Sequence, residues 1–476
     1  MKKLIGCLLG AFLFGSAGAQ ELWDLRRCVD HALANNISVK QQDVQARLAK
    51  LTYDQGKLAQ LPSLNFTSNL GYNFGRSIDR VTNQFTDVSF FYNSMSLQTN
   101  VDVFAFYSKR NLVESNRLLW LANGANVEKV KNDIALNVAV GYLTILQSRQ
   151  QVGILRIKQQ QTAAQLGITR KQVDAGALPE LNAAQLEAQL AQDSANVVNA
   201  KTSEIQALYN MKALLALDAA APFDVAMPPV ELIPVEPLAS LQPDAVYQSA
   251  LKNLPQQRYY GLMVQAGEKQ VAAARGAMYP SLSAGAGMQT NFGSTAQQVD
   301  FLGVTNGVAP IGVVRGTFDT VVAPFSKPNY SAPYKTPYFT QLNNNLSKFV
   351  GFSINVPIFN GGQARTAWKR AQLNVQTARL QLEQDSLTIK QDIYKAYADA
   401  INALEKFNAA SKSVTTNQKA LDYATKRYNI GLLTTLELLN AQTGLFSAQL
   451  QRASAQFEYV FRMKLLEFYK GQGLKL

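Results

Sequence analysis

The side chains that most often carry acid–base or metal chemistry are scarce in this chain. His31 is the single histidine among 476 residues, so histidine-based proton transfer and multi-histidine metal sites are excluded. The sequence also has no glycine-rich phosphate loop, no cysteine cluster and no pair of carboxylates framed by a pocket-like pattern. We therefore predict that the protein is not an enzyme and that it holds no cofactor and no metal.

The N-terminus predicts export from the cytoplasm. Two lysines precede an apolar run at 4–15, and small residues follow at 17–19, which is the pattern of a cleavable signal peptide over 1–19. A lipid-attachment box ending at Cys7 is the weaker interpretation, because cleavage there would leave a signal far shorter than the usual apolar core of about 7–15 residues. Removal of the signal leaves Cys28 alone, so the mature chain forms no intrachain disulfide.

The charge balance is strongly basic, with a formal net charge of +13 at pH 7. Lysine and arginine are nevertheless scattered, and no basic run is interleaved with aromatic residues, which excludes nucleic acid as a partner. After the signal there is no stretch of about 20 apolar residues, so an ordinary transmembrane helix is also excluded.

The chain repeats itself. Pro62-Ser63-Leu64 recurs at Pro280-Ser281-Leu282, a shift of 280 − 62 = 218, whereas Tyr142 recurs at Tyr397, a shift of 397 − 142 = 255. The difference, 255 − 218 = 37, measures one insertion in the second half. We predict a first structural repeat over 20–217, a proline-rich connector at 218–243, and a second repeat over 244–476 in which the segment 293–347 is an enlarged external loop, partly folded over a pore mouth.

Four segments alternate apolar and polar side chains with the period of a β-strand. They lie at 63–74, 94–103, 281–292 and 350–356. Their lengths are 12, 10, 12 and 7 residues, close to the roughly 9–11 that a tilted strand needs to cross a bilayer with one face to lipid and one to water. A soluble β-sandwich is the alternative, although faces rich in Ser, Asn, Gln and Gly suit a wet lumen better. Four strands cannot close a barrel, since the smallest membrane barrels have about eight, so two chains would give eight strands and three would give twelve.

The remaining sequence predicts very long helices. Ala105–Val173 and Ala364–Tyr428 contain no proline, and each would be roughly 100 Å long at 1.5 Å per residue. Apolar residues recur along them at coiled-coil spacing. Four segments predict helices half as long, so that two half-length helices stack beside one full-length helix; these are 22–61, 180–217, 244–279 and 435–469. Gly176 and Gly431 mark the tip turns, where a helix ends with positive φ.

Three segments, together with the duplication and the spaced strands, resemble the TolC-like outer-membrane efflux protein family over essentially the whole mature chain. They are Ile358-Phe359-Asn360-Gly361-Gly362, Tyr428-Asn429-Ile430-Gly431 and Leu436–Ala441. The resemblance implies an α+β membrane protein that forms a homotrimer. Four strands per chain would build a twelve-stranded transmembrane β-barrel in the outer membrane of a Gram-negative bacterium, and a long α-helical barrel would continue it across the periplasm.

The resemblance further implies a passive exit duct for drugs, metals or proteins in a tripartite efflux pump or type I secretion system. Its partners would be outer-membrane lipid, a periplasmic adaptor, and an inner-membrane pump or ATP-driven exporter that supplies the energy. The alternative from a different class is a secreted or periplasmic coiled-coil structural protein without channel activity.

A gate at the periplasmic tip is also implied by the resemblance. The family's acidic positions after the second tip match Glu437 and Asn440, and a family tyrosine that can hydrogen-bond the neighbouring hairpin matches Tyr428. Asn440 is neutral, as are the first-repeat equivalents Asn182 and Gln185, which puts a charged lock between the hairpins in doubt. Three Glu437 side chains around an axis would favour bound cations; the alternative is a solvated helix charge.

The tips themselves are candidates for adaptor contact. Gly176 and Gly431 would form the turns, and we expect Leu178 and Leu433 beside them to be exposed. The alternative for these two leucines is packing within the tip.

Overall fold

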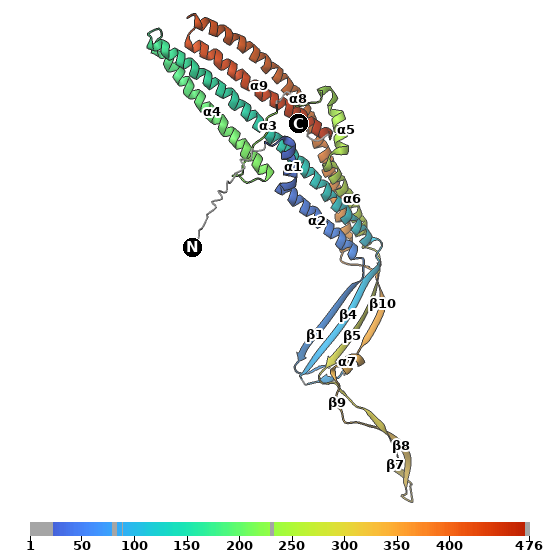
Figure 1. Cartoon of the computed structure of the whole chain (residues 1–476). Coiled ribbons are helices and arrows are strands. Elements are labelled where there is room, and N and C mark those ends of the chain that lie inside the picture. Colours follow the sequence, from blue (N-terminus) through green and yellow to red (C-terminus); the bar gives the residue numbers. More distant parts are fainter. Residues whose placement is uncertain (1–21, 79–82, 88, 229–232, 472–476) are drawn as a thin grey trace, which may run out of the picture. The chain divides into compact units, whose positions relative to one another are not determined.

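The computed structural model describes residues 22–78, 83–87, 89–228 and 233–471 (Figure 1). The predicted signal peptide lies outside these ranges. Within them, no helix is both long and apolar enough to span a membrane. The chain divides into two compact units, and each takes segments from both predicted repeats. The helical unit comprises Met1–Leu51, Asn116–Gly267 and Leu373–Leu476, and the strand unit comprises Thr52–Ser115 and Glu268–Gln372.

The helix boundaries repeat with the two shifts seen in the sequence. Helices α1 (Leu25–Asn35) and α2 (Ile37–Leu58) return as α5 (Pro243–Asn253) and α6 (Pro255–Gly276), because 25 + 218 = 243 and 37 + 218 = 255. Helices α3 (Ser108–Asp174) and α4 (Glu180–Leu215) return as α8 (Gln363–Asn429) and α9 (Thr435–Lys470), because 108 + 255 = 363 and 180 + 255 = 435. The members of each pair are equal in length, at 11, 22, 67 and 36 residues. The duplication is therefore structural as well as sequential.

Two of the predicted half-length helices are wrong in one respect, because each is two helices. Asn36 separates α1 from α2 in an extended conformation; its side chain donates to the carbonyl of Leu214 at 2.9 Å and accepts from the amide of Ser38 at 2.9 Å. In the second repeat, Leu254 separates α5 from α6 and is also extended (ψ 127°). It precedes Pro255, and the residue before a proline avoids the helical region.

The strand unit contains a four-stranded antiparallel sheet in the order β1-β4-β5-β10 (Figure 1). Its members are β1 (Ser63–Asn73), β4 (Phe90–Phe104), β5 (Ser281–Gly293) and β10 (Ser347–Asn355). β4 joins the repeats by pairing with β5. β1 and β10 form the two outer edges, and no further strand pairs with either in the part of the chain that is described.

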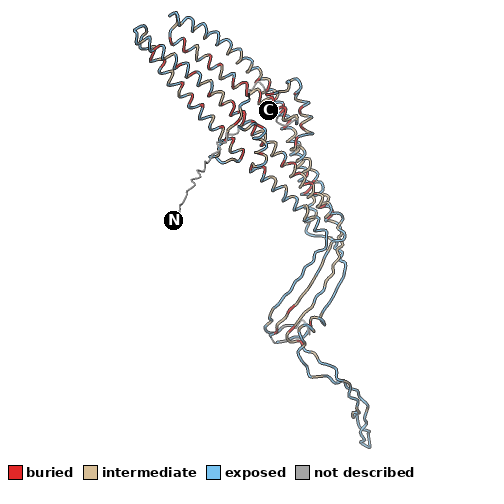
Figure 2. Tube along the Cα trace, in the orientation of Figure 1, coloured by how far each residue is buried: buried red, intermediate tan, exposed pale blue. Residues whose placement is uncertain are grey.

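The register gathers the apolar side chains of all four strands on one face. Val101 lies opposite Ala284, which lies opposite Phe352. The other face is mostly polar or glycine, and its aromatic residues are Phe90, Tyr92 and Phe349; the rings of Tyr92 and Phe349 cover the space above Gly71 and Gly287. Both faces of β1 and β10 are largely exposed in the single chain (Figure 2). The predicted separation of an apolar from a polar face is thus confirmed.

The segment 293–347, which we predicted as an external loop, contains regular secondary structure that the prediction did not include. It forms a ribbon of two antiparallel strands, β7 (Phe301–Val313) and β8 (Thr320–Tyr330). At the base of the ribbon, β6 (Gln297–Gln298) pairs with β9 (Tyr334–Lys335), and the short helix α7 (Tyr338–Asn344) follows. The prolines suggested a loop. Each strand of a two-stranded ribbon has one free edge, however, and a proline whose nitrogen faces that edge does not interrupt the hydrogen bonds between the strands. A smaller pair, β2 (Ser77–Ile78) with β3 (Phe85–Thr86), joins β1 to β4.

The core of the helical unit lies along facing helix stripes and around the connector (Figure 2). Phe223 and Val225 of the connector are buried among residues of α1, α3 and α4. Val225 forms a parallel bridge with Trp23, and the hydroxyl of Tyr142 donates to the carbonyl of Ala226 at 2.7 Å. Further along the connector, a short 3-10 turn at Leu238–Ser240 precedes α5. The connector is therefore an integral part of the core.

Candidate functional site

The two helical hairpins end in the same turn. Gly176 has φ +73° and Gly431 has φ +76°. The amide of Ala177 donates to the carbonyl of Gln172 at 2.8 Å, and the amide of Leu432 donates to that of Arg427 at 2.9 Å. With the glycine amides bonded three residues back, this is the glycine-terminated helix end in which left-handed backbone satisfies the last carbonyls. Both glycines were predicted for this reason.

At the second tip, Glu437 closes a capping box at the start of α9. Its carboxylate accepts from the backbone amide of Thr434 at 2.9 Å and from the hydroxyl at 2.8 Å, while the Thr434 hydroxyl accepts from the Glu437 amide at 3.2 Å. These bonds, first to the Thr434 backbone and then to its side chain, lower the pKa of the exposed Glu437 carboxyl. The carboxylate is thus held at the tip in its charged form, a role that the sequence interpretation did not include.

Of the other gate candidates, Asn440 and Tyr428 lie on the same hairpin as Glu437, and Asn182 and Gln185 are the first-hairpin equivalents of Glu437 and Asn440. Asn440 is exposed on α9. The hydroxyl of Tyr428 lies 3.4 Å from that of Thr435 within its own hairpin. Asn182 and Gln185 are half-buried on α4. Because a single chain is described, a contact between hairpins of different copies remains a prediction.

The first tip carries a positive charge that sequence reasoning missed. Arg170 on α3 lies against Glu180 at the start of α4, 3.7 Å from Glu187, and 4.0 Å from Asp174. The position 255 residues later is Thr425, which is neutral. One signal was available in the sequence, since Arg170 and Asp174 are spaced i and i+4. The two tips therefore differ in their charge contacts: on the first, Arg170 lies among three carboxylates, and on the second, Glu437 is hydrogen-bonded to Thr434 with Arg427 nearby.

The expectation that Leu178 and Leu433 are exposed is wrong, because both are half-buried. Each precedes the residue that caps the next helix, a position whose apolar side chain commonly packs on the first turn. For Leu433, the matching residue in that turn is Leu438, which is buried. The exposed large apolar residues at the tips are instead Ile430, Leu432 and Leu436 on the second hairpin and Leu181 on the first.

The interior of the first hairpin also holds an ion pair. Lys158 Nζ of α3 lies 3.0 Å from Asp193 Oδ1 of α4, and Thr162 donates to the other carboxylate oxygen at 2.8 Å. The Asp193 side chain is fully buried. The corresponding second-repeat residues are Ser413 and Ala448. There a cavity of about 500 Å³ lies between α8 and α9, with Ser413 in its lining.

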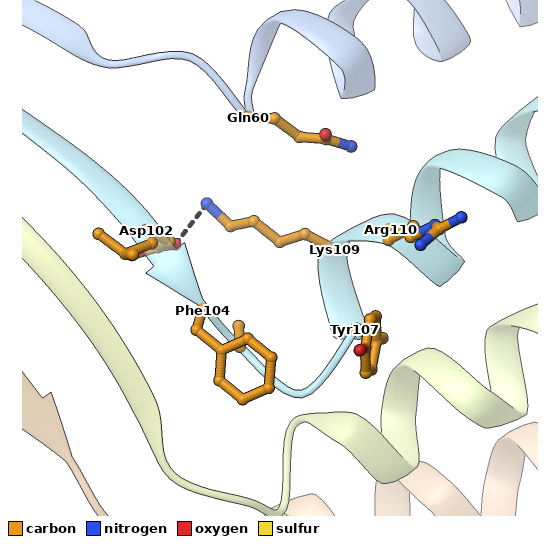
Figure 3. Close-up of a pocket in the computed structure, with 8 residues that line it drawn as sticks. Gln60, Asp102, Phe104, Tyr107, Lys109 and Arg110 are labelled. Atoms are coloured by element: carbon orange, nitrogen blue, oxygen red, sulfur yellow. Dashed lines mark ion pairs between the residues drawn. The ribbon is translucent and has the colours of Figure 1, made fainter.

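At the end of β4, where the chain turns into α3, the strand unit has a shallow pocket of about 330 Å³ (Figure 3). Lys109 reaches across it to pair with Asp102. Phe104 and Tyr107 lie beside it in an edge-to-face arrangement. Aromatic and basic side chains next to a strand end are typical of a membrane–water boundary. Among the residues whose placement is described, no group of His, Cys, Asp and Glu could hold a metal ion.

Comparison with known proteins agrees with this architecture. The family model described as "Outer membrane efflux protein" matches residues 28–217 and 246–460. The chain is 20% identical to outer membrane protein TolC of Escherichia coli over 97% of this chain and 84% of that protein. It is 22% identical to the alkaline protease secretion protein AprF of Pseudomonas aeruginosa over 99% and 89%.

Solved structures show the same fold. A CusC structure superimposes with a TM-score of 0.75 at 17% identity over 94% of this chain and 92% of that chain. The outer membrane protein VceC of Vibrio cholerae gives 0.74 at 16% identity over 95% and 97%. Both superimpose over more than nine-tenths of each chain, so the predicted fold of long helices joined to a four-stranded sheet is confirmed. With both repeats matched by the family model, the chain belongs to the outer membrane efflux protein family and is an exit channel of the outer membrane.

Proposed function

We propose that three copies of this chain close the channel by pairing β1 of one copy with β10 of the next, which gives 3 × 4 = 12 strands. The observation that carries this proposal is the sheet itself: four strands with one aligned apolar face and two unpartnered outer edges. An open edge in lipid leaves backbone groups without hydrogen bonds, at several kcal/mol each. Closure between copies satisfies both edges at once.

The helical hairpins would then form the periplasmic end, with the tips facing a partner. Ile430 and Leu432 are exposed apolar residues on the second tip, next to Gly431 and Leu433. The first tip offers the corresponding turn at Gly176 and Leu178. We infer that a periplasmic adaptor contacts these tips, and that the adaptor couples the duct to an inner-membrane pump or ATP-driven exporter. The chain itself conducts passively.

The substrate would be chosen by these partners. The names of the relatives include both efflux and protease secretion, while the architecture is shared. This supports a duct with no substrate-specific pocket of its own. At its narrow end we propose that three Glu437 carboxylates form a ring, because the capping box holds each one charged at the second tip.

Purified protein tests the proposal. Native mass spectrometry in detergent should give a mass of three chains, and planar bilayers should show discrete channel openings that change when a cognate adaptor is added. Recovery of the mature protein from the soluble periplasm as a monomer, with no conductance, would contradict it.

A further inference from the structure

The ribbon formed by β7 and β8 has one apolar face with nothing packed on it in the single chain. The register places the same-face residues in opposing pairs, namely Val304 with Pro328, Val308 with Pro324, and Pro310 with Val322. Val308 is 65% exposed. The one polar pair on this face is satisfied internally, since Ser326 donates to Asn306 at 2.6 Å. We call these four pairs the ribbon face.

The opposite side of the ribbon differs. The ring of Phe325 lies over Gly307 and covers the backbone of the ribbon there. The side chain of Asn329 donates a hydrogen bond to the hydroxyl of Thr305, and Lys327 contributes a positive charge on this side. The opposite side is thus polar, small or self-covered apart from the exposed Val321, whereas the ribbon face is apolar and open. An isolated two-stranded ribbon is marginally stable in water. An apolar face on such a ribbon implies a partner that covers it.

The edges of the ribbon are poorly suited to pairing with another strand. A proline cannot donate into the ladder, so the pairs that contain Pro310, Pro324 and Pro328 are the non-hydrogen-bonded kind. In such pairs the amide position points outward, and at these three residues there is no N–H to offer. Proline is a common device against edge-to-edge association. The partner is therefore expected on the ribbon face and not along an edge.

The ribbon is firmly anchored at its base. Gln341 of α7 is buried and clamps Gly293 at the end of β5, accepting from its amide at 3.0 Å and donating to its carbonyl at 3.1 Å. Asp300 and Ser331 exchange hydrogen bonds where the ribbon begins. At the far turn, Phe318 is 79% exposed with φ +61°, a conformation that aromatic residues rarely adopt. The backbone conformation at this position does not favour phenylalanine, so we attribute the residue to an apolar contact of its exposed ring with a partner.

We propose that the ribbon face packs against the ribbon faces of the two other copies, so that three ribbons form a small apolar core around the channel axis. The proposal rests on the trimer proposed above. The ribbon arises between β5 and β10, and β10 is the strand that would pair with the neighbouring copy, so the contact continues that interface. Tethering also raises the effective concentration of the three faces to the millimolar range.

Insertion into lipid does not account for this face. Both ribbon edges would carry unpaired backbone groups into the bilayer, which costs several kcal/mol for each group. A foreign extracellular protein would have to compete with two identical faces that are already in place. A second and third copy of this chain are the occupants that the geometry favours.

Single cysteines test the contact in the full-length trimer. Val308→Cys lies on the ribbon face, and its matched control Thr305→Cys is exposed on the opposite side. A short bismaleimide should convert Val308→Cys into covalent dimers, while Thr305→Cys stays monomeric on denaturing gels. In the absence of crosslinker, an impermeant maleimide should label Thr305→Cys rapidly and Val308→Cys slowly. The native Cys28 is buried and serves as the background.

A second variant guards against a local effect of the cysteine. Val304→Asp should abolish crosslinking through Val308→Cys without loss of the native three-chain mass. Equal crosslinking from both sides, or rapid labelling of Val308→Cys in an intact trimer, would overturn the ribbon contact. So would a crosslink to a different protein in cells that disappears on purification. A monomeric native mass would instead contradict the proposed trimer, so the two failures are distinguishable.

Discussion

Lys158 and Asp193 form a buried ion pair between α3 and α4 that has no counterpart in the second repeat. Their separation is 3.0 Å, with a hydrogen bond from Thr162 to the same carboxylate. At the equivalent place α8 and α9 carry Ser413 and Ala448 beside a cavity. The two hairpins share every helix boundary, yet at this place the first holds a buried ion pair and the second has only small uncharged side chains.

Asp193→Ala should strongly destabilise the first hairpin. The change leaves the Lys158 ammonium buried without its partner, and breaking such a pair costs about 3–5 kcal/mol. Replacing both residues together, Lys158→Met with Asp193→Leu, should be close to neutral because no uncompensated charge remains. Asp133→Ala removes an exposed i,i+4 pair with Lys129 and is expected to cost less than about 0.5 kcal/mol. Thermal unfolding and limited proteolysis of the purified protein measure all three; similar losses for Asp133→Ala and Asp193→Ala would contradict the argument.

Glu437→Gln should weaken block of the channel by multivalent cations. Glutamine also suits the third position of a capping box, so the variant removes charge while keeping the start of α9. Thr434→Ala is the reciprocal control, since it removes the cap and keeps the carboxylate. Single-channel recordings with a trivalent cation distinguish them, and unchanged block in Glu437→Gln would refute the carboxylate ring.

The block should also depend on pH in a defined direction. Because hydrogen bonds from Thr434 lower the pKa of Glu437, the carboxylate stays charged below the ordinary pKa of a glutamate. The stability that the capping box contributes is likewise fully present above the ordinary pKa of a glutamate, and it is lost as the pH falls through the lowered pKa of Glu437. Recordings at decreasing pH should therefore retain block in mildly acidic solution. A loss of block already at neutral pH would contradict this.

Gly431→Ala should destabilise the second tip by about 1 kcal/mol. The cost comes from the positive φ, since nothing lies within 4 Å of an added Cβ. Gly153→Ala is the control, because an added Cβ there also meets nothing within 4 Å. Gly153 lies inside α3, where alanine should stabilise the helix by about 1 kcal/mol relative to glycine. Hydrogen exchange at the tip, measured by mass spectrometry, should increase for Gly431→Ala alone.

Phe352→Arg should impair assembly in the membrane, whereas Ser353→Arg should be tolerated. Phe352 lies on the apolar face of β10 and Ser353 on the polar face. An arginine toward lipid near the bilayer midplane costs about 2–4 kcal/mol, while a residue lining the lumen meets water. The yield of trimer extracted from outer membranes measures the difference, and equal yields would argue against the assigned faces.

Cys28 should resist thiol reagents until the protein unfolds. The pKa of the Cys28 thiol is raised to about 12, mainly by burial and next by the nearby Asp24 carboxylate. The unfolded thiol titrates near its usual value of about 8.5, so the protein loses stability as the pH rises above that value. Labelling at pH 8 should be slow in buffer and fast in guanidinium chloride. Fast labelling of the native protein would contradict the buried position.

Periodic features of this fold are readable from the amino-acid order alone. The strand faces follow from an alternation with period two, and the helix stripes from a spacing near seven residues. The tip turns follow from a glycine at the same position of each repeat. Each of these patterns depends on residues that are close together in the sequence. The duplication strengthened these assignments, since Gly176 and Gly431 had to serve the same turn. The repeat shifts of 218 and 255 consequently matched the boundaries of all four pairs of repeated helices.

Features that depend on partners distant in the sequence escaped that kind of reading. Glu437 is a different case, because its capping partner Thr434 is only three residues away and the Thr-x-x-Glu spacing was readable in the sequence. The prolines around Pro324 looked like a loop, whereas pairing with β7 turned them into a strand with a blunted edge. Lys158 and Asp193 are 35 residues apart on two helices, and only the register of α3 against α4 brings them into contact, because side-chain pairing across elements is set by packing and not by local periodicity.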